Sequence, residues 1–237
     1  MGNLFVTGTD TGAGKTWVTL GLMAAAQARG LVVNGMKPVA SGSDWQDGQL
    51  VNADAAQIRD RCSRPVSYHQ VNPYTFEEPI APHVAARKAQ VEVDLETLAS
   101  AYYQLAAGAD RVIVEGVGGW RVPLADGIQT EDLVRRLELS VILVVGLRLG
   151  CINHALLSAE AIGAAGLPFA GWLANGICRN YAEKQATLDY LGNQIPAPYL
   201  GDIPWMARSD PERTGKTIMS DCLFSAQRCG LRPCVLE

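Results

Sequence analysis

The sequence lacks long apolar stretches and an excess of basic residues. Val141–Val145 is among its longest uninterrupted apolar runs, far short of the roughly 20 residues that span a bilayer. Lys and Arg number 20 against 24 Asp and Glu, which gives a formal net charge of −4. Proteins that grip a phosphate backbone are usually more basic than this. These absences argue against a membrane protein and against a nucleic-acid-binding protein.

The chain also lacks a recognisable export signal and paired cysteines. No charged segment followed by a long apolar core stands at the N-terminus. The six cysteines show neither a CxxC pair nor a histidine at zinc-ligand spacing: Cys62, Cys151, Cys178, Cys222, Cys229 and Cys234. We therefore expect free thiols in a reducing compartment and a cytoplasmic protein.

Short β-branched runs alternate with helical stretches along the chain. The predicted strands are Leu4–Thr7, Val32–Met36, Val112–Glu115, Val141–Val145, Phe169–Leu173 and Leu200–Ile203. The predicted helices are Thr16–Arg29, Leu95–Ala107, one beginning at Thr130, Asn153–Ala165 and Tyr181–Leu191. This alternation predicts an α/β fold with a mostly parallel central sheet and helices on both faces.

No internal repeat and no low-complexity linker divides the chain. We therefore expect residues 1–237 to form a single domain. The proline-rich stretch Ser63–Pro82 is predicted to be a long excursion over the surface, and loops of this length in compact domains are often functional.

The first predicted strand runs into Gly8-Thr9-Asp10-Thr11-Gly12-Ala13-Gly14-Lys15-Thr16, a full match to the phosphate-loop pattern G-x-x-x-x-G-K-[ST]. Its glycines let main-chain N–H groups turn toward phosphate oxygens, and the following helix adds a positive partial charge. Lys15 can reach the outer phosphates, and Thr16 offers a hydroxyl to Mg²⁺. The motif predicts a P-loop NTPase fold that binds a nucleoside triphosphate.

Three further charged residues are candidates for phosphoryl-transfer chemistry. Glu115 closes the run Val112–Val114, which places it at the carboxyl end of a central strand, where open α/β sheets bind ligands. Asp54 stands at a predicted helix start, where an acid can also simply complement the helix dipole. Lys37 ends the second strand, at the same edge of the sheet as the phosphate loop. From these residues alone, an exposed lysine and a catalytic lysine are equally consistent with this position.

Several blocks in this sequence resemble the dethiobiotin synthetases of biotin biosynthesis over about residues 3 to 218. They begin with the phosphate loop, continue with Lys37–Gly42, Val71–Phe76 and Val114–Trp120, and end with Leu149–Ala155, Gly171–Asn175, Ile195–Pro198 and Gly201–Trp205. The resemblance implies a ligase that uses ATP and CO₂ to close 7,8-diaminononanoate into a cyclic urea, releasing ADP and phosphate. It implies Mg²⁺ and no organic cofactor.

The resemblance also implies roles for particular residues. Lys37, Lys15 and Thr11 match catalytic positions, and Thr16, Asp54 and Glu115 match the metal ligands. Asn175 matches the position that recognises adenine, and the loop after Pro204 lines the base. The matched ATP-binding positions are Gly12, Ala13, Gly14, Lys15, Thr16, Trp17, Asp54, Glu115, Gly118, Asn175, Gly176, Pro204, Trp205, Met206 and Glu212.

On the substrate side, Thr11, Lys37 and Ser41 match positions that meet the reacting amine and carbamate. Gly150, Cys151, Ile152 and Asn153 lie at a predicted helix start, whose N–H groups suit the far carboxylate of the substrate. The family takes this segment from the neighbouring subunit, so the resemblance implies a homodimer with active sites at its interface.

Two features depart from the family pattern. Many of its members carry an acidic residue where this chain has Gly12, so any role of that side chain is absent or moved. Residues 219–237 match nothing in the family, and we expect them to be a packed or disordered tail.

Three other functions compete with this one. A partition-type ATPase usually carries a second lysine at the position of Asp10, which disfavours that class. The chain has no room for a glutaminase domain, although its length leaves a free-standing, ammonia-using synthetase open. A nucleotide-sensing regulator without turnover is disfavoured because Lys37 and Glu115 are both present. The preference for ATP over CTP and any assembly beyond a dimer also remain open at this point.

Overall fold

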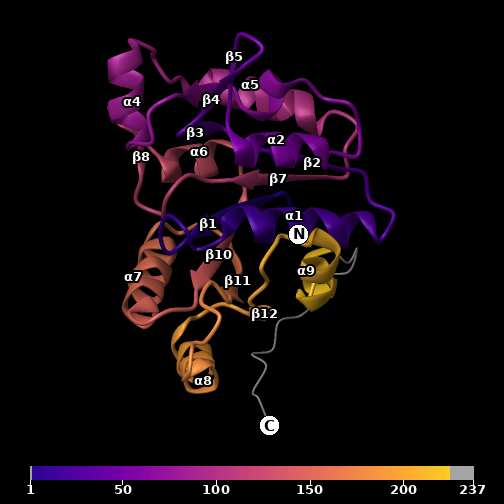
Figure 1. Cartoon of the computed structure of the whole chain (residues 1–237), viewed down its shortest axis with the longest axis vertical. Helices are drawn as coiled ribbons and strands as arrows, with labels where there is room; N and C mark the ends of the chain where they lie inside the picture. Colours follow the sequence, from indigo (N-terminus) through magenta and orange to yellow (C-terminus); the bar gives the residue numbers. More distant parts are fainter. Residues whose placement is uncertain (1, 225–237) are drawn as a thin grey trace.

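The computed structural model describes residues 2–224 and is built on a six-stranded sheet (Figure 1). The strands lie in the order β12-β11-β10-β1-β7-β2, and every neighbouring pair is parallel. Their bounds are β1 Leu4–Gly8, β2 Val33–Met36, β7 Arg111–Glu115, β10 Ser140–Gly146, β11 Phe169–Asn175 and β12 Tyr199–Ile203. Each corresponds to a predicted strand, so the predicted α/β fold is confirmed.

Helices cover both faces of this sheet. Strand–helix–strand connections in a parallel sheet are right-handed, so α1, which leads from β1 to β2, lies on one face. All later connections of the sheet lead toward its other edge, at β12. The helices that they contain, α5, α6, α7 and α8, therefore lie on the opposite face of the sheet. Helix α9 packs along α1 (Figure 1). The bounds are α1 Lys15–Gln27, α5 Leu95–Ala106, α6 Thr130–Arg136, α7 Cys151–Ala164, α8 Lys184–Gln194 and α9 Pro211–Thr217.

Short strands and helices lie around the carboxyl end of β2. They are the parallel pair β3 Val39–Ser41 and β6 Tyr74–Phe76, the hairpin β4 Asp44–Gln46 and β5 Gln49–Val51, the pair β8 Pro123–Ala125 and β9 Ile128–Gln129, and the helices α2 Ala53–Asp60, α3 Tyr68–Val71 and α4 Pro82–Ala89. None of the small strand pairs was predicted, because a three-residue strand carries too little pattern to be recognised.

The prediction that Ser63–Pro82 is only a surface excursion was wrong. This stretch contains α3 and β6, and Val71 and Phe76 are buried in the core. The helix begins where Ser67 and Gln70 form a capping box. The capping box was the signal for this helix that the prediction overlooked. The prolines of the stretch do not argue against these elements, because they stand outside α3 and β6.

The C-terminal residues described by the structure are packed rather than peripheral. The Met219 N–H donates to the Leu200 carbonyl at 2.7 Å, and Leu223 and Phe224 of α10 (Asp221–Phe224) are buried in the core. The part of the expected tail formed by residues 225–237, with Cys229 and Cys234, lies outside the described residues.

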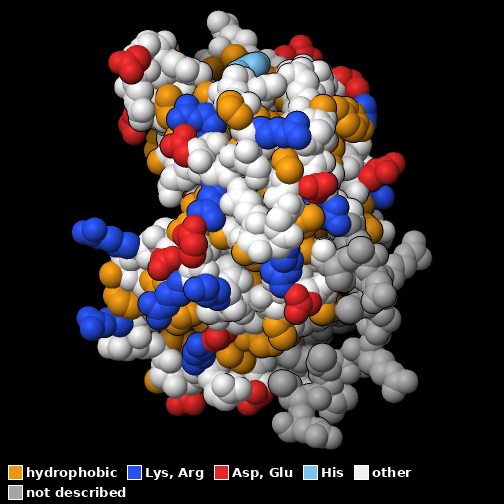
Figure 2. All heavy atoms as spheres, turned by 90° about the vertical axis from the view of Figure 1, so that its right-hand side faces the viewer, with side chains coloured by type: hydrophobic (Ala, Val, Ile, Leu, Met, Phe, Trp, Pro, Cys, Tyr) orange, Lys and Arg blue, Asp and Glu red, His pale blue; other side chains and the backbone are white. Residues whose placement is uncertain are grey.

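Two expectations concern the chain as a whole. Within residues 2–224, no helix is both long and apolar enough to cross a bilayer. Cys62, Cys151 and Cys178 are free thiols. On the face drawn in Figure 2, basic and acidic side chains are interspersed, so that face shows no extended basic patch.

Candidate active site

The phosphate loop connects β1 to α1 in a tight, glycine-dependent conformation. Gly12 and Gly14 have φ of 88° and 85°, in the left-handed region that favours glycine. A Cβ at Gly14 would lie 2.0 Å from Nδ2 of Asn175, so only glycine lets the loop pass this close to β11. At Gly12 a Cβ would meet nothing within 4 Å. A side chain at this position would therefore fit spatially, but its residue would adopt a strained φ.

Lys15, the first residue of α1, is buried beneath this loop. Its Nζ donates to the carbonyl of Asp10 at 3.1 Å and to that of Gly118 at 2.6 Å. Burial, with the nearby charge of Lys37, lowers the pKa of Lys15 from 10.5 to about 8. An anion bound by the loop would relieve the energetic cost of this buried cation.

Lys37 and Glu115 form a fully buried ion pair beside the phosphate loop. Lys37 Nζ lies 2.5 Å from Glu115 Oε1 and 3.5 Å from Asp54 Oδ2, and it donates to the Gly116 carbonyl at 3.2 Å. Although burial alone would lower the pKa of Lys37, the two carboxylates outweigh it and hold this pKa above its ordinary value. The lysine therefore stays charged at neutral pH, and its burial contradicts the exposed-lysine alternative.

The acidic side of the cluster fits a magnesium ion. The Thr16 hydroxyl donates to Glu115 Oε1 at 3.0 Å, whereas Glu115 Oε2 is buried without a hydrogen-bond partner. Asp54 stands in the first turn of α2, where the Asn52 side chain caps the helix. Within residues 2–224, no three His, Cys, Asp or Glu side chains gather as a metal cage. Two carboxylates and a hydroxyl suit Mg²⁺, which takes its other ligands from phosphates and water.

A cavity of about 740 Å³ adjoins these groups. It contains most of the predicted phosphate-end and substrate residues: Thr11, Gly12, Gly14, Lys15, Thr16, Trp17, Lys37, Ser41, Asp54 and Gly118. The prediction assigned no role to three groups of lining residues, which are Asn52 and Gln57, Pro79–His83, and the segment of Val117, Gly119, Val122 and Pro123. Most of the Pro79–His83 group belongs to the proline-rich stretch Ser63–Pro82, which the sequence indicated as a candidate functional loop without assigning a role to its residues. Ala13 is buried behind the loop and does not line the cavity.

The base end of the predicted nucleotide site lies where β11 and β12 end. Asn175 Nδ2 donates to the Ala13 carbonyl at 2.9 Å, and Asn175 Oδ1 is buried without a partner. Gly176 passes so close to the next loop that a Cβ would lie 2.6 Å from the Trp205 nitrogen. The end of β11 thus contacts the phosphate loop through the Asn175 side chain, and the next residue, Gly176, contacts the loop after Pro204.

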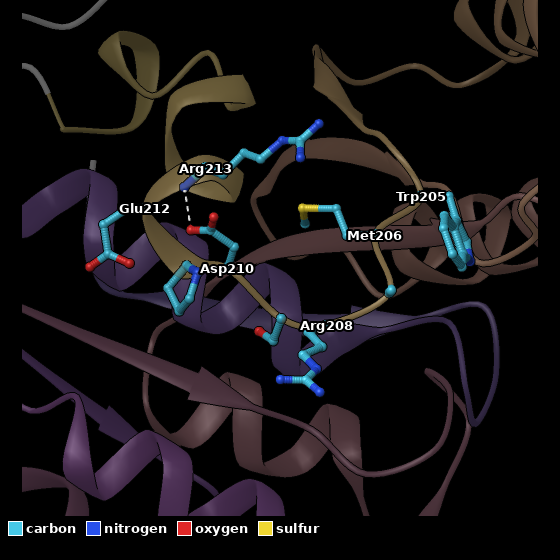
Figure 3. Close-up of a pocket in the computed structure, with 9 residues that line it drawn as sticks. Trp205, Met206, Arg208, Asp210, Glu212 and Arg213 are labelled. Carbon is cyan, nitrogen blue, oxygen red and sulfur yellow. Dashed lines mark hydrogen bonds between the residues drawn. The ribbon is translucent and has the colours of Figure 1, made fainter.

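That loop and the start of α9 line a second hollow, running from Trp205 to Arg213 (Figure 3). The Arg179 guanidinium lies 5.4 Å from the centre of the Trp205 ring. Figure 3 shows Trp205 and Glu212 at opposite ends of the hollow. The Glu212 carboxylate accepts a hydrogen bond from Arg61 at 2.7 Å, and this contact is the main cause that lowers the Glu212 pKa.

Comparison with known proteins identifies the family. A family model described as an AAA domain matches residues 2–213. The ATP-dependent dethiobiotin synthetase of Aromatoleum aromaticum is 48% identical over 214 residues, covering 90% of this chain and 95% of the relative. The chain belongs to the dethiobiotin synthetase family. Enzymes of the same name from Pseudomonas paraeruginosa and Escherichia coli O157:H7 are 50% and 46% identical, covering 87% and 90% of the chain and 91% and 96% of their own lengths.

Solved structures show how widely this fold is shared. A ParA family ATPase from Chlorobium tepidum superposes with a TM-score of 0.53 at 15% identity, covering 96% of this chain and 95% of its own. The MinD cell division protein of Aquifex aeolicus gives 0.51 at 15% identity, covering 93% and 88%. At such identities the likeness concerns the fold alone. The dethiobiotin synthetase family is therefore supported by the sequence relatives.

The remaining residues predicted from the dethiobiotin synthetase resemblance stand apart from the cavity of their own chain. Gly150 caps α7 with a left-handed φ of 91°, and Cys151, Ile152 and Asn153 begin that helix as predicted. They do not line the 740 Å³ cavity. Next to them, Leu149 is 95% exposed. Asn153 is exposed as well, whereas Cys151 is buried and its N–H donates to the Arg148 carbonyl at 3.0 Å.

Proposed function

We propose that this chain catalyses the ATP-dependent closure of 7,8-diaminononanoate with CO₂ to dethiobiotin, with release of ADP and phosphate. The observation that carries the proposal is the position of two lysines, Lys15 and Lys37, at one cavity that the phosphate loop also lines. The reaction must bring a carbamate and a triphosphate together, and both are anions. Two fixed cations reduce their mutual repulsion.

The reaction begins when one amine of the substrate adds to CO₂, forming a carbamate and releasing a proton. A carbamate oxygen then attacks the γ-phosphorus, and the bond to the ADP oxygen breaks, which leaves a carbamic-phosphoric anhydride. Thr11 and Ser41 line the cavity beside Lys37 and suit the amine and carbamate as hydrogen-bonding groups. The second amine attacks the carbamate carbon, phosphate departs, a proton is lost, and the ring is closed.

Lys37 supplies the permanent positive charge in this scheme. Its Nζ is held by Glu115 and Asp54, so it can face the developing negative charge without having to be ordered during the reaction. Thr16, Asp54 and Glu115 would hold Mg²⁺, which supplies charge neutralisation on the phosphate oxygens when bound. Lys15 contributes a second cation at the phosphate loop, and its pKa rises when phosphates approach it.

The site is further proposed to be completed by a second copy of the chain. The start of α7, Gly150–Asn153, would receive the far carboxylate of the substrate bound to the partner, because a helix N-terminus favours an anion. The outward-facing Leu149 and Leu157, 95% and 57% exposed, support an interface at this helix. A cytoplasmic homodimer is expected, and sedimentation of Leu157→Glu as a monomer against a wild-type dimer would test the interface.

The proposed activity is tested by incubating the protein with MgATP, labelled bicarbonate and 7,8-diaminononanoate. We expect the labelled cyclic urea by mass spectrometry, formed one-for-one with ADP. ADP release that does not depend on the diamine, or no product at all, would contradict the proposal and favour a regulatory ATPase. Replacing ATP by CTP in the same assay measures the nucleotide preference.

A further inference from the structure

The main chain of Lys37 is held by a segment outside the central sheet. Its N–H donates to the Val71 carbonyl at 2.8 Å, and its carbonyl accepts from Asn72 Nδ2 at 2.6 Å. Val71 ends α3, and Asn72 lies between α3 and β6. The position of the Lys37 side chain at the cavity therefore depends on a short segment that itself does not line the cavity.

Asn72 is a buried side chain whose hydrogen-bonding capacity is fully used. Its Nδ2 donates to the carbonyls of Lys37 and Tyr74, at 2.6 and 3.1 Å. Its Oδ1 accepts from the hydroxyls of Tyr68 and Thr75, at 2.8 and 2.7 Å. Two donated and two accepted hydrogen bonds are all that a side-chain amide can make. In a buried position they fix the orientation of the Asn72 side chain.

The same network reaches the helix that carries Asp54. The Tyr68 hydroxyl accepts from the Asn52 N–H at 2.7 Å. The Asn52 Oδ1 accepts from the N–H groups of Asp54 and Ala55, at 3.1 and 3.2 Å, and so caps α2. The network Asn52–Tyr68–Asn72 thus fixes the main chain at both Asp54 and Lys37, whose side chains lie 3.5 Å apart.

We propose that Tyr68 and Asn72 are positioning residues, which set the relative placement of Lys37 and Asp54 without touching substrate. A buried polar network costs desolvation unless every member is satisfied, and its main return is a unique geometry rather than stability. A small misplacement of groups that act on a transferring phosphoryl group is costly in rate. The role in turnover rests on the proposed function, whereas the effect on metal-dependent nucleotide binding does not.

Tyr68→Phe is the sharpest test, because it removes one hydroxyl and keeps the ring. We expect kcat to fall about tenfold, since the displacement is less than the ångström-scale error that costs about a hundredfold. Calorimetry should show that the gain in ATP affinity on adding Mg²⁺ shrinks about fivefold, the worth of one hydrogen bond. ATP affinity without Mg²⁺ should stay within about twofold, as the phosphate loop is untouched.

Tyr102→Phe provides a matched control. Tyr102 is also a buried tyrosine, its hydroxyl accepts from the side chain of Asn3 at 2.5 Å, and it lies on α5, away from the cavity. We expect it to lose similar thermal stability but to keep wild-type kcat and wild-type Mg²⁺ dependence. If Tyr68→Phe behaves in the same way, the network is merely structural and the proposal is overturned.

Thr75→Val separates the two branches of the network and serves if Tyr68→Phe does not fold. It removes one donor to Asn72 and leaves the bond between Tyr68 and Asn52 intact. We expect a lower kcat, because the link from Asn72 to Lys37 is weakened. The gain in ATP affinity on adding Mg²⁺ should be nearly unchanged, because the link from Tyr68 to the Asp54 helix is kept. An unchanged kcat would contradict the role of Asn72 in placing Lys37. Wild-type protein that makes no dethiobiotin would instead overturn the proposed function, and the Mg²⁺ titration of Tyr68→Phe would still decide the Asp54 branch.

Discussion

At the phosphate end of the proposed nucleotide site, Lys15, Lys37 and Glu115 are buried and bound to main-chain carbonyls or to each other, whereas at the proposed base end Trp205 is 39% exposed on a loop. The first region is assembled from the carboxyl ends of β1, β2 and β7. The second depends on Asn175 and on the segment between β12 and α9. One end is built from fixed charges, and the other from shape and a few polar groups.

The difference follows from what each end has to recognise. Buried charges are tolerated only with fixed partners, so a site for phosphates and developing charge is necessarily rigid. A nucleoside base is largely apolar and neutral, and a half-open loop with an aromatic ring suits it. Substitutions at the phosphate end should therefore cost turnover, and substitutions at the base end should cost nucleotide affinity.

The largest effect is expected for Lys37→Met. Loss of this cation should lower kcat by about 10³-fold, as removal of a preorganised electrostatic group typically does. It should also lower the free energy of unfolding by about 3–5 kcal/mol, because Glu115 is left as an uncompensated buried charge. Steady-state kinetics and urea unfolding measure the two quantities.

The double variant Lys37→Met/Glu115→Gln separates stability from catalysis. Neutralising the carboxylate should recover most of the lost stability, but no turnover. Near-wild-type kcat in either variant would contradict the assignment of the pair to phosphoryl transfer.

The second prediction concerns the scaffold behind the base end. Ending the chain after Ile218 deletes the buried Leu223 and Phe224 and should lower the free energy of unfolding by about 3–6 kcal/mol, at about 1.5–3 kcal/mol for each side chain. A chain that ends after Phe224 keeps both side chains; it is the control and should be more stable in urea than the chain that ends after Ile218. Equal stability of the two truncated chains would show that this packing contributes little.

The two ends also differ in how well the sequence predicted them. The phosphate loop and Glu115 followed from patterns that are local in the chain, a motif between a strand and a helix and an acid at a strand end. Lys37 and Asp54 were ambiguous, because whether a charge is buried against a partner depends on contacts between segments far apart in sequence. The network around Asn72 was not foreseen, since four hydrogen bonds to one amide leave no periodic trace.

At the base end, local patterns predicted both strands, but the predicted Phe169–Leu173 stops two residues short of the end of β11 at Asn175, and no pattern indicated the partners of these strand ends. Roles for Asn175 and Gly176 were implied only by the resemblance. The side-chain bond of Asn175 to the Ala13 carbonyl and the close main-chain approach of Gly176 to Trp205 are visible only in three dimensions. The pairing of Glu212 with Arg61 joins α9 to the residue after α2, a contact no local pattern encodes.

The third prediction probes the base end directly through Asn175→Ala. We expect KM for ATP to rise about tenfold with kcat within about twofold, because the base loses one hydrogen-bond partner worth about 1–1.5 kcal/mol. The ratio of kcat/KM for ATP to that for CTP should move toward one. Asn193→Ala, which removes an exposed asparagine that also donates to a main-chain carbonyl, is the matched control and should change neither value. A fall in kcat with unchanged KM would contradict the division between the two ends.

The smallest effect is a pH dependence that belongs to the phosphate end alone. Because the pKa of Lys15 is lowered to about 8, the empty site loses this charge as pH rises through that value, and ATP must then restore the proton on binding. The dissociation constant for ATP should rise about fourfold between pH 7 and pH 8.5, while Lys37, whose pKa is raised, stays charged. The free energy of unfolding of the free protein should rise over part of the same pH range. Between about pH 8 and 10.5 the unfolded chain binds more protons at Lys15 than the folded chain does, so the contribution of this lysine to stability increases with pH. Calorimetry over this range measures the first trend and urea unfolding the second. Lys15→Arg, which remains protonated throughout, should abolish both. An ATP affinity that is independent of pH in the wild-type chain would show that Lys15 is already charged at pH 8.5, and that the carboxylates around it outweigh its burial.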